Sequence, residues 1–381
     1  MKSQLTLYLS TLLLSSCSSN HDTAHPIEQH DLSITTDVSI DSIFSDVEVT
    51  PLRFEQDTYP STVFNGRVTD DVIIVSDDHS LIHVFAKDGH YISCSDKHLG
   101  LGPNDYTVLM GFFYNKYCNG IQALTPNNCL FFDYNCTVQN SRKIPTVIGK
   151  DGMIYDNGIA ISSTQSLLTP TIASNKPYQL ALYDHAAEKI LKNIDYSNDV
   201  IAPMNIQNKY FFAMPNGEIL FCPPAFSNYI YQINTQTNSI SRLIELKYSD
   251  NTISKNDLEK FNSDRSEIGQ YLFQSNKEIP ISQLVNSRKI ITTIKIGQQL
   301  SNFYCIVTDR KNGINLKIKI GGDEGYRFPV INDLDEEYAY VFHRKEFITQ
   351  NPQLLMGKAD TDSIFATLDP DDYLLLTYKF R

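Results

Sequence analysis

The sequence contains no tryptophan and has fewer basic than acidic residues. Sugar-binding surfaces often stack their ligands on tryptophan, so its absence weakens the case for a lectin, although 22 tyrosines and 20 phenylalanines can take the same role. The net charge of −12 argues against nucleic acid and against an anionic membrane surface as partners. We therefore expect an unidentified partner of another kind: a protein, a peptide or a glycan.

Catalytic signatures are absent as well. The chain has no G-x-S-x-G elbow, no H-E-x-x-H, no P-loop and no G-x-G-x-x-G motif. The stretch from Gly100 to Pro103 is too short and too restricted by proline to hold a phosphate, and we interpret it as a tight turn. The sequence thus predicts no catalytic residue and no cofactor.

No metal ligand is predicted from the histidines or the acidic residues. Four of the nine histidines lie between His79 and His98, a density that could indicate a metal site. We expect them not to converge, because His83 lies on an apolar strand face while His79 and His90 lie in turns at opposite ends of hairpins. Three acidic clusters lack the D-x-D-x-D-G calcium loop, and we expect them to be solvated turns: Asp70-Asp71, Asp77-Asp78 and Asp369–Asp372. Metal ligands scattered over distant segments are the alternative.

Cysteines leave two interpretations open. The six cysteines other than Cys17 allow fifteen disulfide pairings. Cys118, Cys129 and Cys136 lie close together in the sequence, so a bridge among them is one interpretation. The other is that the cysteines are small buried hydrophobic residues on strands, which suits Cys94, Cys222 and Cys305.

The first residues form a targeting segment. Lys2 precedes an apolar run from Leu5 to Leu14, which is too short to cross a bilayer core of about 30 Å as a helix. The run ends in Leu-Ser-Ser-Cys, and this pattern resembles a bacterial lipoprotein signal. The resemblance implies that residues 1–16 are removed and that Cys17 is acylated. The alternative is an ordinary secretory signal with an incidental cysteine.

The same resemblance implies a cellular location. Lipoproteins of this type reach the outer membrane when the residue after the cysteine is not aspartate, and here Ser18 follows Cys17. We expect an outer membrane lipoprotein of a Gram-negative bacterium, held by the lipid on Cys17 and facing either the periplasm or the cell surface. Residues 17–45 would form the anchor and a flexible tether, because Ser18–Asp31 is polar and has no apolar periodicity.

The stretch from Asp71 to Tyr106 shows a pattern that the rest of the chain repeats. Three short apolar runs are separated by turn residues: Val72–Val75, Leu81–Phe85 and Tyr91–Cys94. Asp88-Gly89 predicts a type I′ turn between the last two runs. Three such strands make most of one antiparallel sheet in about 35 residues, which is the size of a propeller blade.

Later runs predict further blades. The expected strands are Tyr106–Phe113, Ile121–Leu124, Cys129–Phe132, Thr137–Lys143, Thr146–Ile148, Met153–Tyr155, Ile159–Ser162, Gln179–Tyr183, Tyr210–Met214, Glu218–Cys222, Tyr229–Ile233, Ile240–Leu246, Lys289–Ile296, Asn302–Val307, Ile314–Ile320, Glu337–Phe342, Ser363–Thr367 and Tyr373–Phe380. Hairpin signals are Asn-Gly or Asp-Gly pairs that begin at Asn65, Asp88, Asn119, Asp151, Asn157, Asn216 and Asn312. One inserted helix is expected at about 254–273, beginning with a capping box at Ser254 and Asp257.

Three motifs in the first third of the chain resemble those of a known family. V-x-P-L-x-F-E at Val49–Glu55, V-F-x-K-D-G at Val84–Gly89 and G-L-G-P-N-D-Y at Gly100–Tyr106 look like the six-bladed, NHL-like β-propeller lipoproteins of unknown function. Arg53 and Asp105 stand where that family usually has glutamate. The resemblance implies an all-β fold, a six-bladed β-propeller of four-stranded antiparallel blades over residues 46–381, with about 52 residues in each blade.

The two ends of such a ring must meet. Val47–Leu52 precedes the first full blade, and Tyr373–Phe380 is a long apolar run near the C-terminus. Because an unpaired apolar strand is an aggregation hazard, we expect the N-terminal strand to complete the last blade beside the C-terminal strands.

Two functions fit these observations. The sequence favours an envelope-anchored, non-enzymatic binding or scaffolding module, since propellers offer a wide face of loops and a central funnel. The alternative is a propeller hydrolase or lyase with a metal in the central channel. A channel lined by arginine and tyrosine would favour binding, whereas three or more converging Asp, Glu, Asn or His side chains would favour the enzyme.

Overall fold

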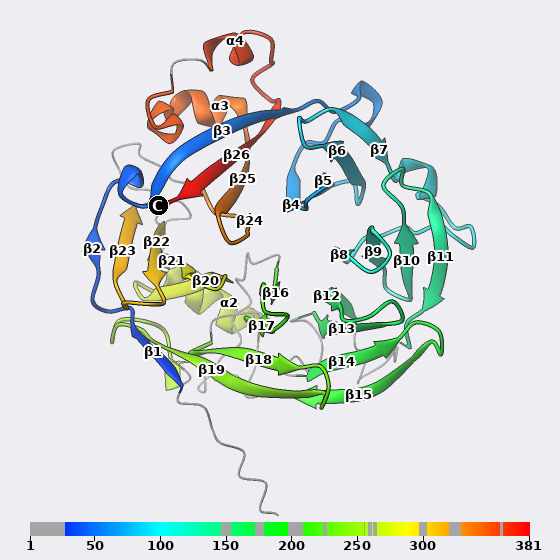
Figure 1. Ribbon diagram of the computed structural model, residues 1–381, viewed down its shortest axis with the longest axis horizontal. Helices are drawn as coiled ribbons and strands as arrows, with labels where there is room; N and C mark the ends of the chain where they lie inside the picture. Colours follow the sequence, from blue (N-terminus) through cyan, green and yellow to red (C-terminus); the bar gives the residue numbers. More distant parts are fainter. Residues whose placement is uncertain are drawn as a thin grey trace, which may run out of the picture.

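Six β-sheets surround a central axis in the computed structural model and form a closed ring (Figure 1). The structure describes residues 27–145, 154–171, 179–196, 209–223, 227–254, 256–257, 261, 265–296, 303–319, 329–358 and 361–381. Within these ranges, four sheets have four strands and two have five. The chain is therefore an all-β, six-bladed β-propeller, as the sequence predicts.

The first three blades follow the chain directly, each with its innermost strand first. Their strands are β4 (Val63–Val68), β5 (Val72–Asp77), β6 (Ile82–Ala86), β7 (Tyr91–Cys94), β8 (Gly111–Asn115), β9 (Gly120–Leu124), β10 (Asn128–Phe132), β11 (Val138–Lys143), β12 (Tyr155–Ala160), β13 (Gln165–Pro170), β14 (Gln179–Asp184) and β15 (Lys189–Asp195). Neighbouring strands in each of these blades are antiparallel.

The last three blades also take in the N-terminal part of the chain. Their strands are β16 (Phe211–Ala213), β17 (Ile219–Phe221), β18 (Tyr229–Asn234), β19 (Ser239–Lys247), β20 (Glu278–Val285), β21 (Lys289–Ile296), β22 (Phe303–Asp309), β23 (Asn315–Lys319), β24 (Asp333–Leu334), β25 (Tyr338–Arg344) and β26 (Tyr373–Phe380). The N-terminal belt, residues 28–52, adds β1 (Glu28–Asp31), β2 (Thr36–Asp37) and β3 (Phe44–Leu52) to the fourth, fifth and sixth blades.

Neighbouring blades pack face to face and bury both faces of their middle strands. All six residues of β5 are buried, which explains why this strand is a continuous apolar run rather than an alternating one. Ile74 belongs to a buried cluster with Phe132 of the second blade, while Ile73 packs in a cluster with Phe342 of the sixth blade. The core is thus a series of apolar layers between the blades, and the ring itself holds each blade in place.

Ring closure joins the two ends of the chain. Strand β3 lies antiparallel to β26, with Leu52 opposite Tyr373 and Phe44 opposite Phe380 (Figure 1). The ring centroids of Phe44 and Tyr378 are 5.0 Å apart, so the closing pair is also packed on its side chains. The prediction that the N-terminal strand completes the last blade is confirmed.

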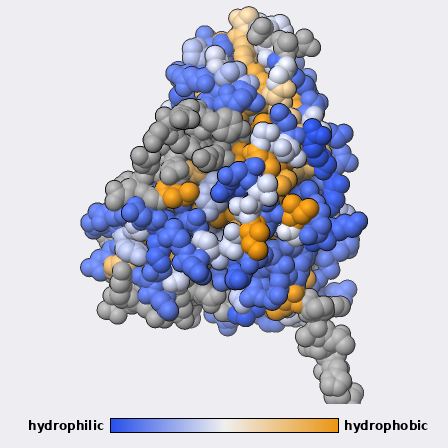
Figure 2. Space-filling view, turned by 90° about the vertical axis from the view of Figure 1, so that its left-hand side faces the viewer, coloured by the Kyte–Doolittle hydropathy of each residue, from blue (hydrophilic) through white to orange (hydrophobic). Residues whose placement is uncertain are grey.

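The propeller was expected to begin at residue 46, but strands of the belt join its sheets from Glu28 onward. The expected boundary is therefore too late in the chain. Strand β1 pairs in parallel with β19, and β2 pairs in parallel with β23, both at outer edges. The side-chain amide of Asn315 donates hydrogen bonds to the backbone oxygens of Asp31 and Ile34, at 2.8 and 3.0 Å. Apolar residues of this segment, Leu32 and Ile40, also pack into the core, but they are too widely spaced to give its sequence an apolar period. Figure 2 shows this side of the ring, which is mostly hydrophilic with a few groups of apolar side chains.

The turn at Asp88-Gly89 differs from the predicted type I′ turn. Gly89 has φ of +83°, whereas Asp88 is not among the residues with positive φ. The Gly89 N–H donates to the Ala86 oxygen at 2.9 Å, and the Ala86 N–H donates to the His90 oxygen at 2.8 Å. These bonds define a type I turn followed by a glycine bulge.

Two other expected hairpin signals lie inside inner strands. Asn65-Gly66 is in β4 and Asn157-Gly158 is in β12. A Cβ on Gly66 would lie 2.0 Å from Cε2 of Phe342 in the sixth blade, so glycine is needed there for close packing and not for a turn. The pairs that begin at Asn119, Asn216 and Asn312 do connect strands, and the pair at Asp151 lies outside the described residues.

Helices and irregular strands account for the remaining differences. The helical elements are α2 (Arg265–Gln274), α3 (Lys345–Gln350), α4 (Asp362–Phe365), η1 (Ile40–Ser42), η2 (Gln56–Thr58), η3 (Asp96–His98) and η4 (Pro352–Leu355). The expected helix at 254–273 is found as α2 over its second half, and most of its first half lies outside the described residues. Ser363–Thr367 is not a strand, because it overlaps α4 in a segment that leaves the ring between β25 and β26 (Figure 1). Among the described residues, no helix has the length and apolar character needed to cross a membrane.

Several observed strands were not expected from the sequence. A bulge conceals the pattern of one of them, and another is too short to have a pattern. Strand β20 contains Pro280, where the register with β21 shifts, and the bulge hides its pattern. Strand β24 has two residues, which is too short to show any period. In the third blade, β13 and β15 were not expected, and Thr146–Ile148 lies outside the described residues.

Candidate functional site

A cavity of about 590 Å³ lies on the axis of the ring. It is lined by the ends of the innermost strands of all six blades, which are β4, β8, β12, β16, β20 and β24, and by the turns that follow them. Its volume is in the range of sites for small organic ligands. The site therefore exists only when the ring is closed, because no single blade supplies more than a part of its wall.

Glycine allows the inner strands to approach one another. A Cβ on Gly111 of β8 would lie 1.8 Å from the backbone oxygen of Asp156 in β12. No other residue fits at this separation without moving one of the two strands. The close approach of β8 and β12 brings the second and third blades together beside the cavity.

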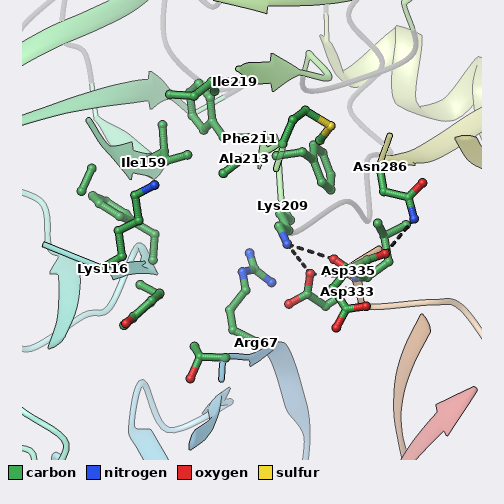
Figure 3. A pocket seen from close by; sticks show the side chains of 18 of the residues that line it. Arg67, Lys116, Ile159, Lys209, Phe211, Ala213, Ile219, Asn286, Asp333 and Asp335 are labelled. Atoms are coloured by element: carbon green, nitrogen blue, oxygen red, sulfur yellow. Dashed lines mark hydrogen bonds and ion pairs between the residues drawn. The ribbon is translucent and has the colours of Figure 1, made fainter. Parts of the chain in front are cut away.

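Two cations and one carboxylate meet in the cavity (Figure 3). Nζ of Lys209 lies 2.5 Å from Oδ1 of Asp333, and the Arg67 guanidinium points toward the same pair. Arg67 is only 6% exposed, and its Nη1 donates to the Gly66 oxygen at 2.7 Å. Burial lowers the pKa of Arg67, while the charge of Asp333 opposes that shift. An arginine side chain is protonated over the ordinary pH range, so Arg67 brings a buried cation to this group.

The Asp333 carboxylate is fixed at the seam between the first and sixth blades. It is 2% exposed and accepts hydrogen bonds from the N–H of Val68 at 3.2 Å and from its neighbour Leu334 at 2.8 Å. With Lys209 as a third donor, both carboxylate oxygens accept hydrogen bonds. Asp333 is therefore a positioned partner for the cations.

Two other acidic groups of the cavity lining, Asp335 and Glu336, are bound within turns. Asp335 accepts hydrogen bonds from the N–H of Glu337 and of Tyr338 and from the Tyr340 hydroxyl. The Ser287 N–H donates to Glu336 at 3.1 Å. These bonds join the turns of the fifth and sixth blades and fix the rim.

Apolar side chains form the wall supplied by the third and fourth blades. Ile159, Phe211, Ala213 and Ile219 line this part of the cavity (Figure 3). Lys116, from the second blade, also lines the cavity, and its Nζ lies 5.4 Å from the centroid of the Tyr117 ring. The cavity thus combines cationic groups with an apolar surface.

One buried carboxyl lies in an inner strand beside the cavity. Burial raises the pKa of Asp156 to about 7, and its Oδ1 has no hydrogen-bond partner. The pKa of Tyr210 in the next blade is also raised, first by burial and then by the charge of Asp156. Asp156 is not part of the cavity lining, so it does not contact the candidate ligand site.

The histidines lie where the sequence placed them. His83 is fully buried, and its Nε2 is 2.9 Å from Oδ2 of Asp77, while His79 and His90 lie in exposed turns. Asp77 is not solvated as expected. It is 3% exposed and accepts hydrogen bonds from the N–H of His79 and of Leu81, so it fixes the turn between β5 and β6.

Among the described residues, one group has the spacing of a metal site. The ligand atoms of Asp77, Asp78 and His79 lie within 4.8 Å of one another. Asp77 is bound to His83 and the turn, and Asp78 accepts hydrogen bonds from Ser61 and Thr62. This group belongs to an outer turn of the first blade and is not part of the cavity lining.

The cysteines are free thiols. This holds for Cys94, Cys118, Cys129, Cys136, Cys222 and Cys305, so no bridge forms among the three of the second blade. Cys222 and Cys305 are buried, as expected for small hydrophobic residues, and burial raises the pKa of the Cys305 thiol to about 12. Cys17 lies outside the described residues.

Sequence reasoning missed the residues of the cavity. Arg67 and Asp333 lie in β4 and β24, two strands that were not expected, and Lys209 lies two residues before the start of β16. None of the three lies in a recognised motif, and Asp333 belongs to a short acidic run, residues 333–337. The signal that could have found them is position, because the ends of the innermost strands lie close to the axis of a propeller.

Comparison with known proteins supports the architecture. Among solved structures, the chain is similar to an exported-protein candidate from Bacteroides fragilis, with a TM-score of 0.70 and 15% identity over 93% of this chain and 99% of that chain. It is also similar to a member of the duf4221 family from Bacteroides vulgatus, with a TM-score of 0.52 and 11% identity over 89% of this chain and 97% of that chain. Identities this low show a shared fold and nothing further.

Family membership is shown by the sequence itself. No match to this chain is found among curated proteins. The model of a family described as 6-bladed beta-propeller, however, matches residues 18–323, which is well over half of the chain. The chain belongs to this family of 6-bladed beta-propellers.

Proposed function

We propose that this protein is an envelope-anchored lipoprotein that acts as a non-enzymatic binding or scaffolding module and holds its ligand in the central cavity. The observation that carries the proposal is the composition of the cavity, where Arg67, Lys209 and Lys116 share the lining with tyrosine and phenylalanine side chains. A wall of this kind recognises a ligand through charge and apolar contact. All six blades contribute to it, so the closed ring presents one preformed site.

The proposed anchor is the lipid on Cys17. Export is supported by the leader-like sequence before it and by the similarity in fold to the exported-protein candidate from Bacteroides fragilis. Replacing Cys17 with alanine is expected to abolish acylation and membrane partition. Uptake of radiolabelled lipid by the variant would overturn the proposed anchor.

The enzyme alternative has less support in the cavity. A metal in the channel would need several free oxygen or nitrogen ligands. The Asp333 carboxylate is bound by Lys209 and two backbone N–H groups, and the Asp335 carboxylate is bound by its own turn and Tyr340. These donors hold the cavity carboxylates in a structural role.

Blocking the cavity tests the binding function. Ala213→Trp places a large ring on the cavity wall, whereas Ala186→Trp places the same ring in an exposed turn of the third blade. Both variants and the native protein are applied to an array of glycans and peptides. We expect ligands that bind the native protein and Ala186→Trp but not Ala213→Trp. Equal binding by all three proteins, or binding by none, would overturn the cavity as the ligand site.

A further inference from the structure

We propose that the start of the belt docks on a membrane surface, with the side chains of Ile34 and Ile314 inserted among the lipid headgroups. The proposal rests on the proposed lipid at Cys17, and it adds which side of the propeller faces the membrane. Three features lead to it: the place where exposed apolar side chains gather, the turns that present them, and their distance along the chain from Cys17.

Exposed apolar side chains gather at the start of the belt. Among the described residues, ten large hydrophobic side chains are exposed, and three of them form what we call the belt patch: Ile27, Ile34 and Ile314. Ile34 is 72% exposed and Ile314 is 52% exposed. Figure 2 views this side of the ring, where groups of apolar side chains interrupt a mostly hydrophilic surface. Single exposed apolar residues are common, but a group of them indicates a surface that contacts something other than water.

Ile34 and Ile314 lie side by side on two parallel segments. Thr36 of β2 is paired with Leu316 of β23, and the two isoleucines come two residues before this pair. The side-chain amide of Asn315 joins the segments directly, because it donates to the Ile34 oxygen at 3.0 Å. The patch is therefore formed by contact between the N-terminal belt and the fifth blade.

Hydrogen-bonded turns present both side chains. The N–H of Ile34 donates to the Asp31 oxygen at 3.3 Å, in the turn that follows β1. The N–H of Ile314 donates to Oδ1 of Asn312 at 3.0 Å, and its oxygen accepts from the N–H of Asp309 at 2.9 Å. Because the backbone of each isoleucine is bonded in a turn, the apolar tips are preformed. They can enter a headgroup layer with little cost for ordering the chain.

The sequence places this patch close to the proposed lipid. Nine residues, 18–26, separate Cys17 from Ile27, which immediately precedes β1. Even a fully extended chain spans only about 35 Å over this separation. A surface tethered within such a distance of a bilayer meets it at a high effective concentration, so a weak apolar contact is enough to hold it there.

A bilayer fits the belt patch better than a protein partner does. A stable protein interface buries about 800 Å² on each side, around an apolar centre. The belt patch instead combines three isoleucines with exposed polar residues of the same turns, Ser33 and Lys311. A headgroup layer accepts this mixture, because apolar side chains reach the acyl chains while polar ones stay among the phosphates. Since the chain has a net charge of −12, we expect the leaflet to be zwitterionic.

Docking at the belt would also leave the central cavity accessible. Strands β1 and β2 lie at the outer edges of the fourth and fifth blades, away from the axis (Figure 1). With this edge against the bilayer, the axis of the ring runs along the membrane plane. A ligand can then approach the cavity along the axis without passing through lipid.

A tryptophan placed in the belt patch tests the proposal. The chain contains no tryptophan, so Ile34→Trp provides a single fluorescent probe in the full, lipidated protein. The protein is reconstituted on vesicles of phosphatidylcholine and phosphatidylethanolamine, in which part of the phosphatidylcholine carries bromine, a quencher of tryptophan, on its acyl chains. We expect the emission to shift to shorter wavelength and the brominated lipid to quench it at least about twofold.

Leu101→Trp is the matched control. Leu101 is 93% exposed, more than Ile34, and it lies in the connection between β7 and β8. That connection is across the ring from β1 and β2 (Figure 1). We expect its emission to stay at the wavelength of solvated tryptophan, without quenching. If the affinity of tryptophan for lipid alone caused quenching, this more exposed position would be quenched at least as strongly.

A second set of variants tests whether the two isoleucines dock together. Ile314→Trp is expected to be quenched like Ile34→Trp. Adding Ile34→Asp to Ile314→Trp should reduce this quenching at least about twofold, because a carboxylate is costly to move toward the acyl chains. Adding Leu101→Asp to Ile314→Trp makes the same change of charge across the ring and should leave the quenching unchanged.

The outcomes separate docking from the proposed anchor. Flotation of the native protein with the vesicles measures the anchor, and a protein that does not float would overturn both proposals. With normal flotation, equal quenching of Ile34→Trp and Leu101→Trp, or quenching of neither, would overturn docking alone. Emission of Ile34→Trp at short wavelength without quenching would also overturn it, because a protein surface such as a second copy of this chain would then cover the patch.

Discussion

The first and last blades of this ring are assembled from the chain in different ways. The first blade is continuous, from β4 through β7, and short turns join its strands. The last blade combines β24, β25 and β26 with β3, which comes from the other end of the sequence. Closing such a long loop costs entropy that is recovered only when the whole ring has formed. The ring therefore depends most on the pairing of β3 with β26, two strands that lie at opposite ends of the sequence.

The largest effect is expected at the seam between the two ends. Deleting residues 372–381 removes β26, which leaves β3 without its partner in the sheet and β25 paired only with the two-residue strand β24. We expect the whole propeller to lose its cooperative unfolding transition, as measured by circular dichroism and size-exclusion chromatography. Deletion of residues 18–26, which lie before β1, should not change the melting midpoint. A soluble, monomeric and cooperatively folded product of the first deletion would contradict the closed-ring model.

Substitution of two glycines that have similar φ angles can show how much the contact between the first blade and the belt restricts the side chain at position 89. Gly89 and Gly217 have φ of +83° and +86°. A Cβ on Gly89 would lie 1.9 Å from the backbone oxygen of Pro51 in β3, whereas Gly217 has nothing within 4 Å. We expect Gly217→Ala to cost about 1 kcal/mol from backbone strain, and Gly89→Ala to cost about 2 kcal/mol more, in urea titrations. Equal costs would mean that the belt moves away freely.

Asp156, which lies in β12 away from the seam, is expected to make the stability of the fold depend on pH. Its pKa is about 7 in the folded protein, against 3.8 for the free side chain. Between these two values the unfolded chain has released the proton and the folded chain has not, so stability falls as pH rises from about 4 to about 7. Asp156→Asn should remove this fall and be more stable than the native protein by about 2 kcal/mol at pH 8, with no such gain at pH 4. The free energy of unfolding at both pH values checks this.

The smallest effect is expected at the start of the belt. Glu28 binds Arg310 with two hydrogen bonds, at 3.0 and 2.7 Å, and Arg310 also donates to the Asn286 oxygen beside the cavity. Burial raises the pKa of Glu28, but its bonds to His30 and Arg310 outweigh this and lower the pKa to about 2. Its contribution is complete above pH 4.5 and is lost as pH falls toward 2.

Glu28→Gln is expected to cost about 1 kcal/mol at pH 7, because the ion pair is half-buried. Glu48→Gln is the control, since Glu48 lies exposed on β3 of the same belt. Thermal unfolding of both variants at pH 7 gives the comparison. If the two melting midpoints coincide, the belt start does not stabilise the ring.

Much of the fold was predictable from the sequence because its blades form locally. Apolar runs and turn residues predicted β26 over Tyr373–Phe380 and strands close to β9 and β10. The same local reasoning failed where a neighbour decides the structure. Gly66 resembles half of a turn signal but lies in a strand, because Phe342 of the sixth blade needs the space. Strands β1 and β2 have no apolar pattern, because they add to sheet edges through backbone bonds.

The sequence by itself determined the fold class, since hydrophobic period and turn chemistry are properties of short segments. The number of blades came from the resemblance of three motifs to a known family, and the pairing of the chain ends was expected from the apolar strand at each end. Only the tertiary structure decided where the site lies. Lys209 and Asp333 are 124 residues apart in the chain, and Val68 and Asp333 are 265 apart, yet they share one hydrogen-bonded group. Isolated charged residues carry no pattern in sequence, and they become a site because ring closure brings the ends of six inner strands to one axis.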